Sequence, residues 1–362
     1  MNQDEKKKSA LTEKSGVTQP ETVSKSSAGH VRAQRSKVPS AEELVQGILS
    51  GDITSLSRAI TLVESTNPEH LEKAGIVIGG SLAASGKSVR IGITGVPGVG
   101  KSTFIEAFGK YLTNAGKKVA VLAVDPSSTI SHGSILGDKT RMEELVKDKN
   151  AYIRPSASGE TLGGVARKTR ETITLCEAAG FDTIIIETVG VGQSETAVHG
   201  MVDFFLLLKI AGAGDELQGI KRGIMEMADA IVINKADGDN IKKARLAKIE
   251  FTRALHLFPP KSSGWIPKVS TCSALTQDGI PEVWETIVEF LDLTKANNAF
   301  NQRRQSQNEY WMLETIDSEL KNRFYNNPEM TALLDAAKKA VINNEASPFS
   351  EAQAMLEAYF KK

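Results

Sequence analysis

The chain has 362 residues, of which 40% are hydrophobic and 24% charged, a composition typical of a globular protein with one large domain and appendages, or with two ordinary domains. Its 44 Lys and Arg residues equal its 44 Asp and Glu residues, so no general positive field would attract the phosphates of a nucleic acid. The two cysteines, Cys176 and Cys272, lie too far apart for a zinc or redox motif and indicate core residues in a reducing compartment. No apolar run approaches the length of a membrane span, and we expect no membrane partner.

Residues 1–39 are polar, rich in Ser and Lys, and nearly free of aromatic side chains. Such a segment buries too little apolar surface to offset the entropy of ordering, so we expect a disordered tail. The tail lacks the apolar stretch of a secretion signal, and it carries acidic residues that an import presequence would avoid. The sequence therefore predicts a cytoplasmic protein.

A helical region is expected over residues 40–86. Ser40 is placed to cap a helix, and Glu43 would complete a capping box with it. Apolar residues at helical spacing follow in three runs, around residues 44–49, 56–63 and 71–82. These runs predict three short amphipathic helices before the next domain.

Short β-branched runs alternate with helical patterns over residues 87–293. Most of the runs are apolar at consecutive positions, as expected for strands that helices cover on both faces. The alternation predicts right-handed crossovers and a doubly wound α/β domain with a mostly parallel sheet. The expected strands are 89–94, 119–124, 152–154, 183–187, 204–210, 230–234 and 268–272.

The strand pattern stops before residues 294–362. Met312, Ile316, Leu320 and Phe324 form a helical stripe, and apolar residues near 333–341 and 355–359 predict two further helices. This segment has too few apolar residues for a core of its own. We expect it to pack on the sheet domain, on a second copy of the chain, or on both.

A glycine-rich segment from Gly95 to Ser102 fits the pattern G-x-x-x-x-G-K-[ST] of a P-loop, between a predicted strand and a predicted helix. Its backbone N–H groups and the helix N-terminus would surround phosphate oxygens. Lys101 should reach the β- and γ-phosphates, and the Ser102 hydroxyl should bind Mg²⁺. The predicted phosphate-binding residues are Gly95, Val96, Pro97, Gly98, Val99, Gly100, Lys101, Ser102 and Thr103.

The base is predicted to be guanine, because Asn-Lys-Ala-Asp at residues 234–237 ends a predicted strand. The Asp237 carboxylate can accept hydrogen bonds from guanine N1–H and from its exocyclic amine, which adenine lacks. Asn234 would hold the loop and face the other base edge, and the stem of Lys235 would cover the ring. Ser273, Ala274 and Leu275 form a companion loop, in which the Ala274 N–H would meet guanine O6.

A metal and γ-phosphate site is predicted after the strand at 183–187. Glu187 would hold Mg²⁺, and the Gly190 N–H would meet the γ-phosphate, so that Lys101, Glu187 and Gly190 are the expected catalytic residues. Asp125 and Asp138 are acidic residues near the carboxyl end of another strand, where ligands of an open sheet collect. No Gln directly follows Gly190, and Gln193 lies two residues too far along, so the residue that orients water is not identified.

Together these segments resemble the SIMIBI-type P-loop GTPases that accompany cobalamin-dependent acyl-CoA mutases, including the methylmalonyl-CoA mutase chaperones of bacteria and mitochondria. The resemblance covers residues 56–293 and extends into the C-terminal helices. The segments that carry it are 95–103, 124–128, 133–142, 187–195 and 234–237.

The resemblance implies a GTP-hydrolysing chaperone that gates adenosylcobalamin delivery to a mutase and protects or reactivates it, with GTP or GDP and Mg²⁺ bound. Ser102, Asp125, Asp138 and Glu187 match the metal positions of the family. The C-terminal helices at 294–362 resemble a dimerisation arm and imply a homodimer. The segment 212–221 resembles a loop that engages the mutase, with Asp215, Gln218 and Lys221 at its interacting positions.

Two other functions use the same phosphate loop. A nickel or zinc insertion GTPase would require a Cys/His cluster, whereas the five histidines of this chain are scattered. A small-molecule kinase would transfer phosphate to a hydroxyl or guanidino group, and it would normally use ATP without a guanine-reading loop.

Overall fold

The structure is a computed structural model that describes residues 39–65, 67–124, 142–155, 162–188, 194–212 and 222–361. The predicted disordered tail lies outside the described residues except for its last position. None of the helices in the described ranges combines the length and the apolarity needed to cross a membrane.

Seven parallel strands form one sheet in the described part of the chain, in the order β3-β2-β4-β1-β5-β6-β7. The order runs outward from β1 in both directions, which is the doubly wound arrangement that the sequence predicts, and the fold prediction is confirmed. The strands are β1 (Val89–Gly95), β2 (Val119–Val124), β3 (Ala151–Arg154), β4 (Thr183–Thr188), β5 (Phe204–Ile210), β6 (Ala230–Asn234) and β7 (Lys268–Thr271).

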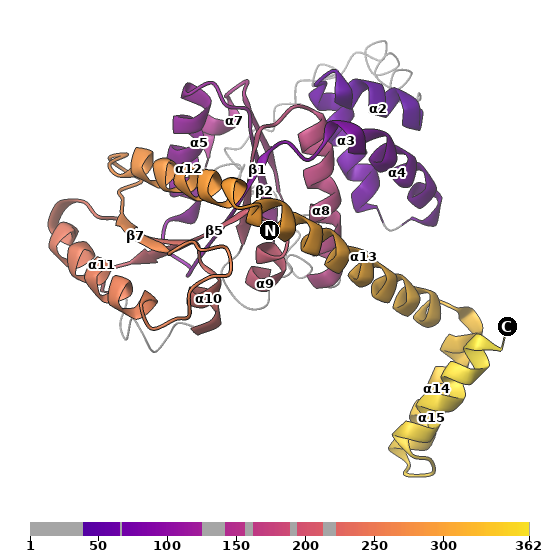
Figure 1. Cartoon of the computed structure of the whole chain (residues 1–362). Coiled ribbons are helices and arrows are strands. Elements are labelled where there is room, and N and C mark those ends of the chain that lie inside the picture. Colours follow the sequence, from indigo (N-terminus) through magenta and orange to yellow (C-terminus); the bar gives the residue numbers. More distant parts are fainter. Residues whose placement is uncertain are drawn as a thin grey trace, which may run out of the picture.

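Helices cover both faces of the sheet (Figure 1). Successive residues of β4 therefore alternate between two cores: Ile184 and Ile186 pack on one side and Ile185 on the other. The helices of the first side are α8 (Leu162–Ala178), α9 (Ser194–His199), α10 (Arg222–Met227) and α11 (Ile241–Leu255), and those of the second are α5 (Lys101–Asn114), α7 (Glu143–Val146) and α12 (Ile280–Ala296).

Three N-terminal helices, α2 (Ala41–Leu49), α3 (Ile53–Glu64) and α4 (Pro68–Ser81), pack on one another and on α8. The predicted capping box is present, since the Glu43 N–H donates to Ser40 Oγ at 3.1 Å and the Ser40 N–H donates to Glu43 Oε2 at 2.8 Å. A single 3₁₀ turn, η1 (Leu82–Ala84), then leads into β1. This helical group adds to the hydrophobic core on one face of the sheet, and Glu64 at the end of α3 pairs with Arg154 at the carboxyl end of β3.

The C-terminal segment forms one long helix, α13 (Ala299–Tyr325), and a hairpin of α14 (Pro328–Ile342) and α15 (Pro348–Phe360). The first half of α13 lies on the sheet domain, where the Trp311 indole N–H donates to Gly200 O at 2.9 Å and the Gln307 side-chain amide donates to Val202 O at 2.8 Å. Its second half carries the hairpin away from the sheet (Figure 1). The helical stripe predicted from Met312 to Phe324 thus belongs to the half of α13 that leaves the domain.

Candidate functional site

The glycine-rich segment forms the turn between β1 and α5, as predicted. Gly98 and Gly100 have φ angles of +80° and +90°, a region that other residues rarely adopt. A Cβ atom on Gly100 would lie 2.9 Å from Asn234 Nδ2, and one on Gly95 would lie 2.7 Å from Leu208 O. The loop therefore needs glycine both for its conformation and for the close approach of neighbouring strand ends.

Lys101 begins α5, and its Nζ donates a hydrogen bond to Gly95 O across the loop at 2.8 Å. Burial lowers the pKa of Lys101, while the nearby carboxylates of Glu187 and Glu195 oppose this shift. A half-buried ammonium in the first turn of a helix, next to the N–H groups of the helix N-terminus, is a strong site for phosphate.

Two side chains tie the predicted base loop to the phosphate loop. Asn234 Nδ2 donates to Val99 O at 2.9 Å, and Lys235 Nζ donates to Gly98 O at 2.9 Å. Asn234 Oδ1 accepts the Ala274 N–H at 3.2 Å, so Asn234 joins the phosphate loop to the companion loop after β7. Three loops that sequence analysis placed separately on a nucleotide thus form one connected surface at the carboxyl ends of β1, β6 and β7.

The Asp237 carboxylate is held from the side. Ser273 Oγ donates to Asp237 Oδ2 at 2.5 Å, and the same hydroxyl accepts the Thr276 N–H at 3.1 Å. Asp237 is partly exposed, whereas Ser273 is almost fully buried. A carboxylate kept in one orientation by a buried hydroxyl is pre-organised to bind a base. Leu275 of the companion loop is 79% exposed.

The predicted metal-binding residue Glu187 also lies at the carboxyl ends of the strands. Glu187 is the penultimate residue of β4, pairs in register with Ile93 of β1, and is 8% exposed. Thr188 Oγ1 donates to Thr94 Oγ1 at 2.8 Å and joins the ends of the two strands. The charge of Glu187 acts on Lys101, which begins α5 after the loop that follows β1, and Ser102 is the next residue of that helix.

The remaining predicted site residues lie outside the described residues: Asp125, Asp138, Gly190, Asp215, Gln218 and Lys221. Within the described ranges, no group of three or more His, Cys, Asp or Glu side chains is arranged to hold a metal ion.

Sequence analysis missed two buried polar residues at this edge. Ser194 and Glu195 open α9 and are only 1% and 2% exposed. They lie within the segment 187–195 that carries the family resemblance, but their spacing gives no sign of a role. The only sequence feature that could have indicated its burial is that Glu195 lies three residues before Val198, an apolar residue that packs on the sheet.

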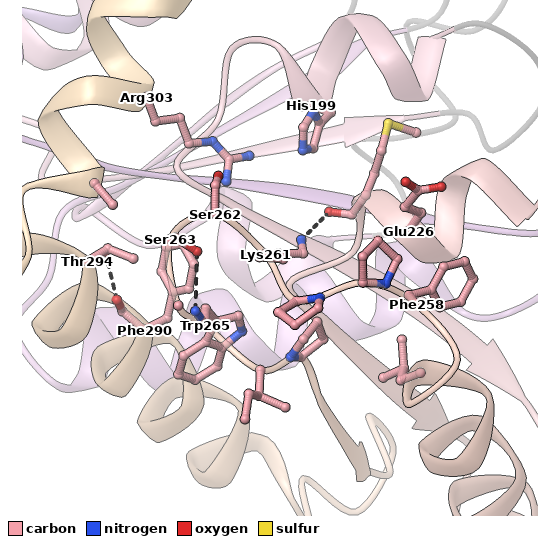
Figure 2. A pocket seen from close by; sticks show the side chains of 18 of the residues that line it. His199, Glu226, Phe258, Lys261, Ser262, Ser263, Trp265, Phe290, Thr294 and Arg303 are labelled. Carbon is pink, nitrogen blue, oxygen red and sulfur yellow. Dashed lines mark hydrogen bonds between the residues drawn. The ribbon is translucent and has the colours of Figure 1, made fainter.

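A pocket near the amino ends of the strands, opposite the nucleotide loops, is lined by α9, α10, α13 and the loop before β7 (Figure 2). Two of its lining residues, Lys261 and Arg303, pair with the buried Asp229 carboxylate, Lys261 Nζ at 2.6 Å and Arg303 Nη1 at 3.4 Å. Burial, and then the charge of Arg303, lowers the pKa of His199 to about 4, so this imidazole is neutral at pH 7. Because these charges pair with one another, the pocket is best explained as a structural junction that holds α13 on the strands.

The profile of a family described as "Methylmalonyl Co-A mutase-associated GTPase MeaB" matches residues 56–329. A probable GTPase of Mycobacterium tuberculosis is 50% identical over 314 residues, covering 87% of this chain and 94% of that protein. The mitochondrial methylmalonic aciduria type A homolog of Mus musculus is 47% identical over 328 residues, covering 88% and 79%. A crystal structure titled as an LAO/AO transport system kinase superposes with a TM-score of 0.71 at 39% identity, covering 90% of this chain and 100% of that one.

Proposed function

The chain belongs to the family of methylmalonyl-CoA mutase-associated GTPases and hydrolyses GTP, and from this we propose that it is a nucleotide-gated chaperone of a cobalamin-dependent acyl-CoA mutase. Its hydrolysis cycle would gate the delivery of adenosylcobalamin and protect or reactivate the mutase. The observation that carries the client assignment is the family match over residues 56–329, which includes both nucleotide loops and the first half of the C-terminal segment.

The nucleotide site of this proposal is the surface formed by the three loops. Phosphates would lie on the backbone of the loop after Gly95 and against Lys101, and guanine would lie against Asp237. The bonds from Asn234 and Lys235 to the phosphate loop support this assignment, because they fix the distance between the phosphate end and the base end of one ligand.

Magnesium is the metal that suits the donors present. The Ser102 hydroxyl and the Glu187 carboxylate are hard oxygen donors at one strand edge, and Mg²⁺ is usually held by one or two carboxylates together with substrate phosphates. When bound, the ion would neutralise charge on the β- and γ-phosphates. We expect Glu187→Ala to lower the GTP hydrolysis rate at saturating Mg²⁺ while GDP still binds, and unchanged Mg²⁺-dependent turnover would contradict the assignment.

The mutase would be sensed through the segment that includes Asp215, Gln218 and Lys221, a role that rests on family resemblance. The test is the GTP hydrolysis rate with and without purified methylmalonyl-CoA mutase. We expect the mutase to accelerate the parent protein and Lys221→Ala to keep its basal rate but lose the acceleration. Lys243→Ala, an exposed lysine of α11, is the matched control and should behave like the parent. A parent protein that neither binds nor responds to the mutase would contradict the client assignment.

A homodimer built through the C-terminal arm is part of the proposal. The second half of α13 and the hairpin expose large apolar side chains that no other part of the described chain covers: Met312, Leu313, Ile316, Leu320, Tyr325, Leu333, Ile342, Phe349, Leu356 and Phe360. Exposed apolar surface of this extent is typical of an interface, and a second copy of the arm presents the same self-complementary surface.

A kinase is the alternative to test, because one similar solved structure carries that title. A kinase would leave the γ-phosphoryl group on an acceptor, whereas a GTPase releases it as inorganic phosphate. GTP labelled in the γ-phosphate, incubated with the protein and arginine as a guanidino acceptor, distinguishes the two. We expect all of the label to appear as inorganic phosphate.

A further inference from the structure

Helix α9 holds one acidic side chain inside the nucleotide edge of the sheet. Glu195 lies in its first turn and is 2% exposed, and α9 packs against β1 and β4, the strands that lead to Lys101 and Glu187. The helix approaches β1 closely because position 92 is glycine: a Cβ there would lie 3.1 Å from Val198 Cγ1. Glu195 is thus positioned by the packing of a whole helix rather than by a surface loop.

The Glu195 carboxylate lies near other charged side chains, but its surroundings satisfy its hydrogen bonding only in part. Its charge acts on the Lys101 ammonium, as does that of Glu187, so both carboxylates lie within electrostatic range of Lys101. The Oε2 atom of Glu195 is buried, and it has no hydrogen-bond partner among the residues that the structure describes. A buried carboxylate oxygen without a donor is unfavourable because it has lost its hydrogen bonds to water, so a donor supplied with the substrate would stabilise it.

We propose that Glu195 orients the attacking water of GTP hydrolysis by accepting a hydrogen bond from it. No Gln directly follows Gly190 in this sequence, so this task is unassigned. The proposed magnesium site does not require the Glu195 carboxylate, because Mg²⁺ is usually held by one or two carboxylates together with substrate phosphates, and Ser102 and Glu187 are the donors proposed for it. Of the polar side chains described at this end of the strands, Thr94, Thr188 and Asn234 are already hydrogen-bonded to protein. Ser194 Oγ is also buried without a partner among the described residues, but a carboxylate accepts a hydrogen bond from water more strongly than a neutral hydroxyl does.

In the proposed hydrolysis of GTP, Glu195 neither gains nor loses a proton and forms no covalent bond. The water oxygen forms a bond to the γ-phosphorus, and the bond from phosphorus to the β–γ bridging oxygen breaks, with its electron pair remaining on GDP. A water proton passes to a γ-phosphate oxygen, so the products are GDP and inorganic phosphate. Glu195 lowers the barrier by holding the water in line with the leaving oxygen.

The test compares single-turnover hydrolysis of GTP by three variants. Glu195→Ala removes the acceptor and should lower the rate by roughly 10²–10³-fold, the usual effect of deleting one oriented hydrogen-bond partner at a reacting centre. Glu195→Gln keeps an acceptor oxygen and should stay within about tenfold of the parent. Thr196→Ala, at the exposed next position of the same helix, is the matched control and should hydrolyse GTP like the parent.

Two binding measurements separate orientation of water from other roles. The affinities for GDP and for a non-hydrolysable GTP analogue should change by less than about threefold in Glu195→Ala, and so should the Mg²⁺ concentration that gives half the maximal rate. A Glu195→Ala rate close to that of the parent would overturn the proposal. It would also be overturned by a large rise in the Mg²⁺ requirement, which indicates a metal ligand, or by a Glu195→Gln variant as slow as Glu195→Ala, which indicates proton transfer.

Discussion

At the scale of single residues, base recognition depends on a carboxylate whose orientation is set by a neighbouring hydroxyl. Ser273 is 1% exposed and donates to Asp237 at 2.5 Å, so rotation of the carboxylate would leave the proton of a buried hydroxyl without an acceptor. Selectivity for guanine would therefore come from pre-organisation as well as from the hydrogen bonds themselves.

Asp237→Asn should exchange guanine for xanthine specificity. The asparagine amide donates where the carboxylate accepts, so it opposes guanine N1–H and matches the carbonyl that xanthine carries in place of the amine. We expect GTP affinity to fall by a factor on the order of 10²–10⁴ and xanthosine triphosphate to bind in its place. Calorimetric titration with both nucleotides measures the exchange. Asp239→Asn, at an exposed position two residues along, is the control, and equal GTP affinity in both variants would contradict the assignment.

Gly100→Ala should separate backbone strain from a steric clash. Gly100 and Gly116 both have positive φ, at +90° and +81°, but only a Cβ on Gly100 meets a neighbour, Asn234 Nδ2 at 2.9 Å. Both substitutions should cost about 1 kcal/mol of unfolding free energy through strain. Only Gly100→Ala should also abolish GDP binding, because it pushes Asn234 away from the phosphate loop. Urea unfolding and GDP titration of both variants provide the comparison, and GDP binding retained by Gly100→Ala would contradict it.

The residues of the site were predictable where their chemistry is local. The phosphate loop and the loop at 234–237 are short patterns whose meaning depends on adjacent residues, and the structure brings them together as expected for one nucleotide. Glu195 was not predictable in this way. Its burial depends on the packing of Val198 over Gly92, which lies more than a hundred residues earlier in the chain, and no spacing rule connects these positions.

At the scale of elements, the strands were well predicted because helices cover both faces of the sheet and make each strand apolar at consecutive positions. The observed strands differ from the predicted ones by no more than one residue at any end. The short helices α7, α9 and α10 were not predicted, since four to six residues are too few to show a helical period. Each of them buries an apolar side chain against the sheet domain: Leu145, Val198 and Met225.

Arg304 fastens α13 to the sheet and to the segment before β1. Its guanidinium makes two hydrogen bonds to the Asp203 carboxylate, at 2.8 and 2.7 Å, and it also donates to the carbonyl oxygens of Gly86 and Ser88. The Asp203 side chain is 1% exposed, so removing the arginine leaves a buried charge. Arg304→Met should lower the free energy of unfolding by about 3–5 kcal/mol in urea titration.

The matched control is Arg323→Met in the same helix. Arg323 pairs with Glu319 at 3.1 Å, but the two side chains are 70% and 44% exposed, so this loss should cost less than about 1 kcal/mol. Similar stability losses in the two variants would show that Arg304 acts through general packing of the helix rather than through its buried ion pair.

At the scale of the whole molecule, the protein divides into a compact sheet domain and an arm that extends from it (Figure 1). The Phe324 ring meets the Tyr359 ring at a centroid distance of 5.3 Å, so the hairpin has a small core where it meets the end of α13. That core leaves most of the apolar surface of the arm exposed. An arm of this kind is stable in water when a partner covers it, and a second copy of the chain supplies an identical surface.

Ile316→Glu should therefore separate the copies without affecting the chemistry. Ile316 and Leu320 lie one turn apart on α13 and are each 48% exposed, so they belong to one apolar face. A carboxylate on that face would have to be buried against apolar side chains, and the free energy of dimerisation should weaken by several kcal/mol. Light scattering during size exclusion should give twice the chain mass for the parent and a single chain mass for the variant, with basal GTP hydrolysis unchanged because the nucleotide loops are distant.

Asn322→Glu adds the same charge at an exposed polar position and should remain dimeric. A parent protein that elutes with the mass of one chain at every concentration would contradict the homodimer, and dissociation of both variants would indicate general repulsion rather than a specific apolar contact.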